Sequence, residues 1–324
     1  MTAQRDLEPY GVQATTTLRL CFATNDPPMN RVVFNIAGPE SVSIAVMDTG
    51  VLIFDFSHSV SHSGGAVSEY KLDHGNNVPT IAQKQIQARN NIRDRRAIYV
   101  NAFLSCFNSV IQSNRLTPPM TQENYILVRA SDRGMELHCA TSPALLHPIS
   151  YMVEPVSHEM LAEVMRLSIE AYLRAPDIFY DLLEMLYRAA FQCTQHDFQG
   201  SLVLSWVVIE KAQNALWKNF ITTGYKNVNP NTNIGGHRRD ILLTDHNYTA
   251  AIKSQILSLS GLYNDQELKS IDDVRKARNK LMHNLSRVDL IGAMNATTCA
   301  MSMASKVLGE RIYFQVSPTS WDKL

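Results

Sequence analysis

The 324-residue sequence lacks the marks of several protein classes. No apolar run approaches the roughly 18 residues of a membrane span, and the opening MTAQRDLEPYG has no secretory-signal pattern. Its five cysteines are far apart and include no C-x-x-C pair, so we expect neither a disulfide framework nor a zinc knuckle. We therefore expect a soluble cytoplasmic protein with reduced, mostly buried thiols and no membrane partner.

Net charge is also absent, because thirty Lys and Arg balance thirty Asp and Glu. A protein that coats nucleic acid through a basic surface would be strongly positive, so the composition is compatible only with a local basic site. Neither G-x-x-x-x-G-K-[ST] nor G-x-G-x-x-G occurs, which excludes the common phosphate-cradling loops. His58 and His62 have metal-ligand spacing but stand among Ser and Gly with no nearby carboxylate, which favours a surface loop. We expect no bound metal and no cofactor.

Proline is unevenly distributed: nine of the 13 precede residue 151, and none lies between His237 and Glu310. In the first 75 residues, segments rich in Val, Ile, Phe and Thr alternate with turn sequences, which predicts strands at TTTLRLCFAT, RVVFNIAG, SVSIAV and VLIFDF. Residues 80–113 have apolar side chains at helical spacing and no Gly or Pro, which predicts one long helix. ENYILVRASDRGMELHCAT follows as an expected hairpin that turns at SDRG.

The second half has the pattern of long helices, at residues 158–175, 176–193 and 199–221. The polar stretch 222–239 is expected to be a loop. The pairs Ser270-x-x-Asp273 and Ser286-x-x-Asp289 have capping-box spacing, so they predict the starts of the last two helices, the first of which ends near His283 or Asn284. The expected fold class is α+β, with a mostly-β domain containing one long helix at 1–155 and an all-α bundle at 156–324.

A local basic cluster lies at the expected junction of these last two helices. It holds five basic residues and no acidic one, namely Arg275, Lys276, Arg278, Lys280 and Arg287. Asn279 and His283 are four residues apart, so on a helix they share a face and the amide can orient the imidazole. Arg278 and His283 are about 140° apart around a helix. They converge only if the long Arg278 side chain swings round or the helix opens near its end.

The pattern Arg278-Asn279-x-x-x-His283 at a helix junction resembles the motif of the HEPN superfamily (higher eukaryote and prokaryote nucleotide-binding domains). That motif is Arg, four to six residues and His, often with Asn directly after the Arg. SLVLSWVVIEKAQNALW is similar to the family's second helix, with Glu210 as its acidic residue. The resemblance covers residues 158–310 and implies an HEPN-like bundle. Some prokaryotic antiviral proteins have a similar layout, with an unrelated domain before the bundle.

The resemblance implies a metal-independent endoribonuclease that acts on RNA as a homodimer, in antiviral defence or as a toxin. RNA supplies its own 2′-OH nucleophile, so His283 would transfer protons and Arg278 would stabilise the charge on the phosphate. Asn279 would fix the imidazole tautomer or contact the ribose. Glu210 would orient Arg278, or it simply lies at the exposed edge of its helix. The first domain would sense a trigger or a regulatory partner, or would position RNA.

Further basic residues are candidates for RNA phosphate contacts. They are Arg275, Lys276, Lys280 and Arg287 in the cluster, and His237, Arg238 and Arg239 in the polar stretch. A solvated helix face or loop end would have the same composition. A HEPN domain that binds RNA or a protein without cutting would also have it, so a non-catalytic scaffold is the alternative function.

Two features bear on regulation and assembly. Toxin–antitoxin members of the family carry a modifiable Tyr two residues after the His, where this chain has Leu285, so that form of control is in doubt. The final helix, AMNATTCAMSMASKVLG, is rich in Ala, Met and Ser. These residues favour a dimer interface, unless they pack inside one bundle.

Overall fold

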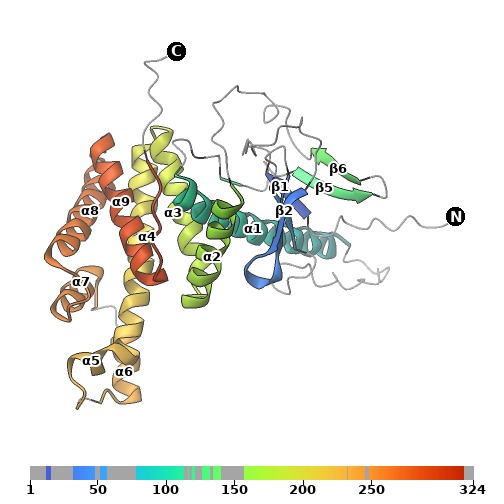
Figure 1. The fold of residues 1–324 in the computed structure, drawn as a ribbon. Coiled ribbons are helices and arrows are strands. Elements are labelled where there is room, and N and C mark those ends of the chain that lie inside the picture. The colour runs from blue at the N-terminus through green and yellow to red at the C-terminus, as the bar shows by residue number, and fades with distance from the viewer. Residues whose placement is uncertain are drawn as a thin grey trace. The chain divides into compact units, whose positions relative to one another are not determined.

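A computed structural model of the chain describes residues 12–15, 32–47, 52–56, 78–112, 116, 119–120, 126–131, 134–139, 157–231, 233–244 and 248–316. The chain divides into two compact units, Met1–Phe107 with Thr117–Ile169 and Asn108–Leu116 with Glu170–Leu324. Helices α1 (Val78–Ile111) and α2 (His158–Arg174) contribute residues to both units (Figure 1). The division between the units in this region lies within α2, between Ile169 and Glu170, so the boundary expected between residues 155 and 156 stays a prediction. No described helix is both long and apolar enough to cross a membrane.

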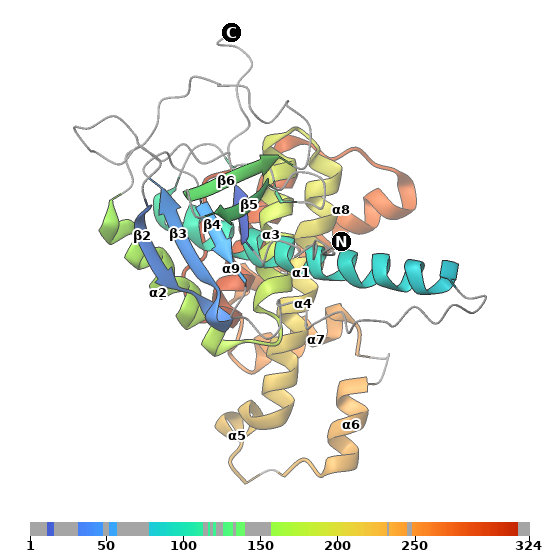
Figure 2. The same ribbon diagram turned by 90° about the vertical axis from the view of Figure 1, so that its right-hand side faces the viewer.

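The first unit contains a six-stranded antiparallel sheet in the order β2-β3-β4-β1-β5-β6 (Figure 2). Its strands are β1 (Val12–Thr15), β2 (Val32–Ala37), β3 (Ser43–Met47), β4 (Leu52–Asp55), β5 (Ile126–Ser131) and β6 (Gly134–Cys139). The expected strands at β2, β3 and β4 are confirmed, and so is the β5–β6 hairpin, in which Ser131 pairs with Gly134. Most of the strand expected at TTTLRLCFAT, together with His58 and His62, lies outside the described residues.

Aromatic side chains connect this sheet with α1. Leu52, Phe54 and Phe56 alternate along β4 and just beyond it, and all three are buried, as the two-residue period of a strand requires. The Phe54 ring meets Phe103 of α1 edge to face at 5.3 Å between centroids, and the Tyr99 hydroxyl donates to the Pro39 carbonyl at 3.0 Å. Such aromatic pairs add to the burial energy, so the sheet and α1 share one core.

The second unit is helical, which confirms the expectation for the C-terminal part. Its elements are α3 (Phe179–Thr194), α4 (Phe198–Asn219), the π-helical turn η3 (Phe220–Gly224), α5 (Tyr225–Val228), α6 (Gly236–Thr244), α7 (Ala250–Leu259), α8 (Asp265–Asn284) and α9 (Leu290–Leu308). Helix α4 is central, because α3, α7, α8 and α9 all pack against it. Helix α8 packs against α4, α7 and α9, and its C-terminal end leads through residues 285–289 into α9.

Helix α9 packs against α4 through small side chains. Thr297 lies with its hydroxyl 3.2 Å from that of Ser201 and 3.3 Å from that of Ser205, and all three residues are buried. All but one of the Ala and Met residues of α9 are buried as well, namely Ala293, Ala296, Ala300, Met301, Met303 and Ala304, whereas Met294 is half-buried. The expectation that this stripe forms a dimer interface is therefore wrong. Small residues permit close helix approach in either setting, and here the partner is α4 of the same chain.

The starts of α8 and α9 also differ from the expected ones. Asn264 caps α8, because its Oδ1 accepts from the Glu267 amide at 2.8 Å while Glu267 Oε2 accepts from the Asn264 amide at 2.9 Å. Ser270 lies inside α8 and donates to the Gln266 carbonyl at 2.8 Å, a bond that Ser makes readily within helices. Asp289, rather than Ser286, caps α9 by accepting from the Gly292 amide at 2.8 Å.

Glu267 also joins the first turn of α8 to the last turn of α9. Lys306 Nζ lies 2.7 Å from each Glu267 carboxylate oxygen and donates to the Leu262 carbonyl at 2.7 Å. Glu267 and Lys306 are each about one quarter exposed, so water only partly screens their attraction. The helix that carries the basic cluster is thus fixed at its start.

Replacing Glu267 tests this anchor. Glu267→Ala removes the ion pair with Lys306 and the carboxylate half of the capping box, while the bond from the backbone amide of residue 267 to Asn264 Oδ1 remains, so we expect the free energy of unfolding to fall by about 1 to 2 kcal/mol. Glu267→Gln retains a capping amide and loses only the charge, so its loss is smaller. Urea unfolding followed by circular dichroism measures both, with the exposed neighbour Gln266→Ala as the control. A midpoint in Glu267→Ala equal to that of the control would contradict the anchor.

Candidate functional site

The motif residues occupy the last two turns of α8. Arg278 and Asn279 are half-buried and His283 is exposed, whereas Leu281 faces the core. Helix α8 continues to Asn284, which confirms the expected end. Because the helix does not open before its end, only the length of the Arg278 side chain can bring the guanidinium towards His283.

Asn279 is bonded to Arg278. Arg278 Nη1 donates to Asn279 Oδ1 at 3.2 Å, which turns the guanidinium towards the helix face that carries His283. In the part of the chain that the structure describes, no hydrogen bond joins Asn279 to His283. The arrangement therefore orients the arginine, while the expected contact from the amide to the imidazole is not made.

Glu210 is exposed on α4. Among the described residues, no hydrogen bond or ion pair joins it to Arg278, whose recorded partner is Asn279. Of the two expectations for Glu210, its position fits the exposed edge of the helix.

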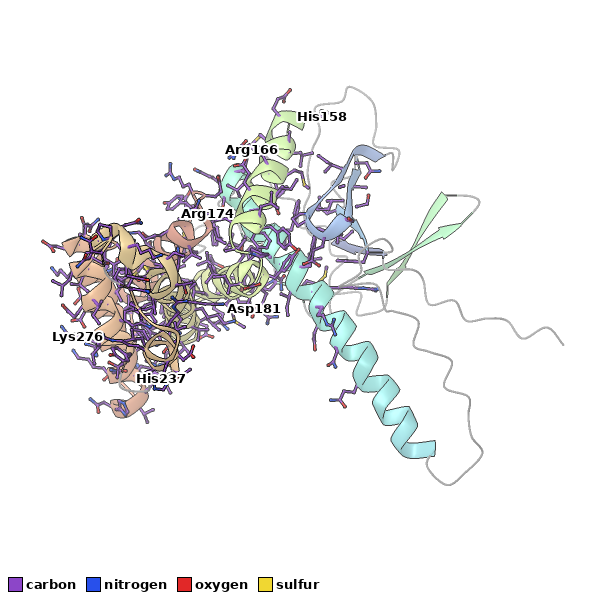
Figure 3. The ribbon with its side chains drawn as sticks, turned by 90° about the horizontal axis from the view of Figure 1, so that it is seen from below. His158, Arg166, Arg174, Asp181, His237 and Lys276 are labelled. Carbon is purple, nitrogen blue, oxygen red and sulfur yellow. The ribbon has the colours of Figure 1, made fainter. Side chains whose placement is uncertain are left out.

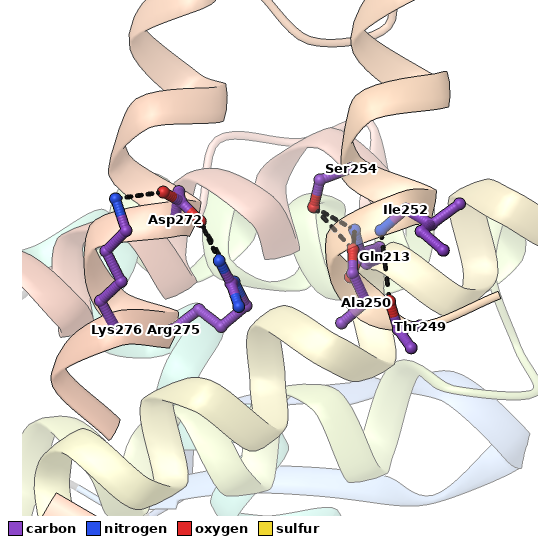
Figure 4. A network of polar contacts seen from close by, with 8 residues as sticks. All are labelled: Gln213, Thr249, Ala250, Ile252, Ser254, Asp272, Arg275 and Lys276. Atoms are coloured by element: carbon purple, nitrogen blue, oxygen red, sulfur yellow. Dashed lines mark hydrogen bonds and ion pairs between the residues drawn. The ribbon is translucent and has the colours of Figure 1, made fainter. Parts of the chain in front are cut away.

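Asp272 neutralises part of the basic cluster, as Figure 4 shows. Its Oδ1 accepts from Arg275 Nη2 at 2.5 Å, and its Oδ2 lies 2.6 Å from Lys276 Nζ. Hydrogen bonds from Lys276 and then Arg275 lower the pKa of Asp272 below its usual range. The sequence does carry a signal for this pairing, because Asp272 precedes Arg275 by three residues and Lys276 by four, which places the three side chains together on a helix. Asp272 lies just before the interval from Arg275 to Arg287 that defines the basic cluster.

The rest of the cluster is more open. Lys280 and Arg287 are exposed, and among the described residues neither side chain has a hydrogen bond or an ion pair. Together with His283 they surround the turn between α8 and α9. Free positive charge therefore gathers at the C-terminal end of α8, where it also favours the negative end of the helix dipole.

His237, Arg238 and Arg239 do not join this site. They form the first turn of α6, so the expectation of a loop is wrong there, and Arg239 Nη2 donates to the Ile234 carbonyl at 3.2 Å. Helix α6 packs near η3, and Trp217 Nε1 donates to its Leu242 carbonyl at 3.0 Å. His237 and Lys276 lie near each other in the view from below (Figure 3), but Figures 1 and 2 show α6 and α8 well separated.

The turn after α8 has an unusual residue in a left-handed conformation. Leu285 has φ 50° and ψ 32°, its amide donates to the Leu281 carbonyl at 3.0 Å, and the Ser286 amide donates to the Lys280 carbonyl at 3.4 Å. The bond from the Leu285 amide to the Leu281 carbonyl is that of the αL C-cap motif, in which glycine normally occupies the position of Leu285. A leucine there costs about 1 kcal/mol of backbone strain.

The structure also bears on metal binding and on the cysteines. Within the described ranges, no group of three or more His, Cys, Asp and Glu side chains is placed to hold a metal ion. Cys106, Cys193 and Cys299 are buried thiols that form no disulfide. Burial, followed by the charge of Glu267, raises the pKa of the Cys299 thiol to about 12, so this thiol is protonated at neutral pH.

Comparison of the chain with models of protein families, with curated proteins and with solved structures finds no match.

The conformation of Leu285 yields a stability prediction. Leu285→Gly relieves the strain of the left-handed backbone, so we expect the free energy of unfolding to rise by about 1 kcal/mol. Gly309, which caps α9 at φ 71°, provides the reverse control, because Gly309→Ala introduces the same strain. We expect Gly309→Ala to lower the free energy of unfolding by about 1 kcal/mol in urea titrations. A destabilised Leu285→Gly protein would contradict the strain.

Proposed function

We propose that the chain is a metal-independent endoribonuclease of HEPN type and that its helical second half is an HEPN-like bundle. One observation carries the proposal: Arg278, Asn279 and His283 lie on the last two turns of α8, directly before the turn into α9, with His283 exposed. The resemblance of the sequence to the family motif implied this position. The all-helical second unit is the setting in which that motif occurs.

The side chains suit cleavage by the RNA's own 2′-OH. The 2′-oxygen bonds to phosphorus as the bond to the 5′-oxygen breaks, leaving a cyclic phosphate and a 5′-hydroxyl. His283 can accept the 2′-OH proton or donate one to the departing 5′-oxygen. Arg278 can stabilise the additional negative charge on the phosphate oxygens, and the bond from Arg278 to Asn279 limits the positions of the guanidinium.

One chain provides a single motif histidine, whereas this reaction benefits from both a base and an acid. A two-fold homodimer, which the family resemblance implies, supplies two copies of His283. The Ala and Met stripe of α9 is not available for that interface, because it is buried against α4. A cytoplasmic role in defence or as a toxin, with the first domain sensing a trigger, is the corresponding biological proposal.

A non-catalytic scaffold that binds RNA or a protein is the second candidate function. Its support is that His283 has no orienting hydrogen bond among the described residues, although catalytic histidines usually have one. Lys280 and Arg287 would serve binding equally well without cleavage.

A cleavage assay in EDTA distinguishes the two functions. We expect the wild-type protein to cut a mixed RNA pool in the chelator, and His283→Ala to cut at least about 100-fold more slowly, because it lacks the proton carrier. Arg278→Lys should bind RNA but lose most activity, because an ammonium cannot make the planar bidentate contact. His196→Ala, which removes an exposed histidine between α3 and α4, is the control.

Three results would count against the enzyme. Equal cleavage rates for His283→Ala and wild type would remove His283 from the mechanism. Full activity in Arg278→Lys would contradict the phosphate role of the arginine. RNA binding without cleavage, in the wild-type protein and in His283→Ala alike, would support the scaffold.

Asp272 provides a separate prediction about affinity. Asp272→Asn removes the carboxylate that holds Arg275 and Lys276, so both cations become available to RNA phosphates. We expect tighter binding at low salt, and a slope of log affinity against log salt that is steeper by about one to two. Asp273→Asn is the control, because it removes the same charge from an exposed neighbour without releasing a recorded ion pair. Equal binding by the two variants would show that the pairing does not limit affinity.

A further inference from the structure

Large apolar side chains are exposed around the turn between α8 and α9. Met282, Leu285 and Ile291 have exposed fractions of 53%, 83% and 67%. Single exposed apolar residues are common on protein surfaces, but neighbouring ones at a junction indicate a contact surface. This one directly adjoins His283.

Leu285 is exposed and its backbone is strained as well. A glycine at this position would adopt the left-handed backbone conformation without strain, and the exposed leucine side chain contributes little to the core. Strained positions that the fold does not need are found at functional sites, where the side chain acts on a ligand. An exposed leucine in a position suited to glycine therefore points to a contact outside the chain.

Met282 lies among the motif residues. It follows Arg278 by four positions and Asn279 by three, so on the regular helix α8 it occupies the arc between Arg278 and His283. A substrate that contacts both Arg278 and His283 must therefore pass over the Met282 side chain.

Charge identifies what covers this surface. Lys280, His283 and Arg287 are exposed around it, whereas Asp289, the acidic residue that follows, is engaged as the cap of α9 by accepting from the Gly292 amide. Two copies of such a surface would repel each other, whereas a polyanion would be attracted. The ligand must also present apolar faces to Met282 and Leu285. Single-stranded RNA has both properties, with its phosphates and its unstacked bases.

We propose that Met282 and Leu285 form a nucleobase platform at the C-terminal end of α8, with Lys280 and Arg287 on the neighbouring phosphates. The platform deepens the proposed function and rests on it, since it takes RNA to be the ligand of the motif. It makes Leu285 and Met282 residues that select an unpaired nucleotide, whatever its base, next to the bond that is cut. Apolar contact to base faces is tolerant of sequence, so the platform favours unpaired RNA over duplex.

The test compares two oligonucleotides of equal charge and length. One is a 2′-O-methylated single strand, which resists cleavage by 2′-OH attack, and the other has the same backbone without bases. Fluorescence anisotropy in EDTA should show tighter binding of the strand that has bases. Leu285→Gly and Met282→Ser should each weaken that binding by roughly fivefold, because apolar contact is lost. Neither should alter binding of the abasic strand.

Folding defects are excluded by the choice of variants. Leu285→Gly should melt at or above the wild-type temperature, so weaker binding in this variant reflects the lost side chain. Leu173→Ser, which alters a leucine on α2 with 71% exposure, is the matched control and should bind both strands like wild type. Opposite effects of Leu285→Gly on stability and on binding would be the expected signature of the platform.

Each contrary result has a definite meaning. Equal binding of the two strands by the wild-type protein, or undiminished binding by both platform variants, would overturn the platform. A change from dimer to monomer in Leu285→Gly, seen by sedimentation, would overturn it and assign the surface to a second copy of the chain. Wild-type cleavage with undiminished binding in the variants would overturn the platform alone. Base-dependent binding without any cleavage would overturn the enzyme and support the platform.

Discussion

The close packing of α9 against α4 is the constraint on which the candidate site depends. Thr297 meets Ser201 and Ser205 in a buried contact of three hydroxyls, which only small side chains allow. This contact fixes the direction of α9, and α9 in turn fixes where the turn from α8 must end. The motif residues therefore owe their position to a polar contact in the helical core, because a larger side chain at Thr297 would displace the helix that follows the motif.

Much of the helical unit could be predicted from the spacing of apolar residues, because long helices with one buried face leave a clear period in the sequence. The end of α8 was predictable from residues 286–289, because a start signal for the next helix there leaves room for only a short turn. The start of α8 was not. Ser270 and Asp273 have the spacing of a cap, but the preceding residues continue the helix, and Asn264 with Glu267 makes the cap instead. Local spacing cannot decide between two caps when tertiary contacts extend the helix.

The candidate site was predictable in composition but only partly in geometry. Arg278, Asn279 and His283 lie where the motif placed them, yet the amide bonds to the arginine, because the guanidinium can reach it from the adjacent residue. The cluster from Arg275 to Arg287 suggested five uncompensated basic side chains, but Asp272, which directly precedes it, forms ion pairs with Arg275 and Lys276. His237 looked like part of a loop because glycines precede it, whereas the contact of Trp217 with Leu242 docks that segment as a helix. Such pairings depend on three-dimensional neighbours.

Lys306 has a consequence for local motion. Its ammonium binds the Leu262 carbonyl and Glu267 at once, and it lies 5.3 Å from the centre of the Tyr263 ring. The first turn of α8 and the last turn of α9 therefore share one cation, so neither can open without breaking the contacts of the other. Amide hydrogens in these two turns should exchange with solvent as one cooperative unit, although almost forty residues of chain separate them.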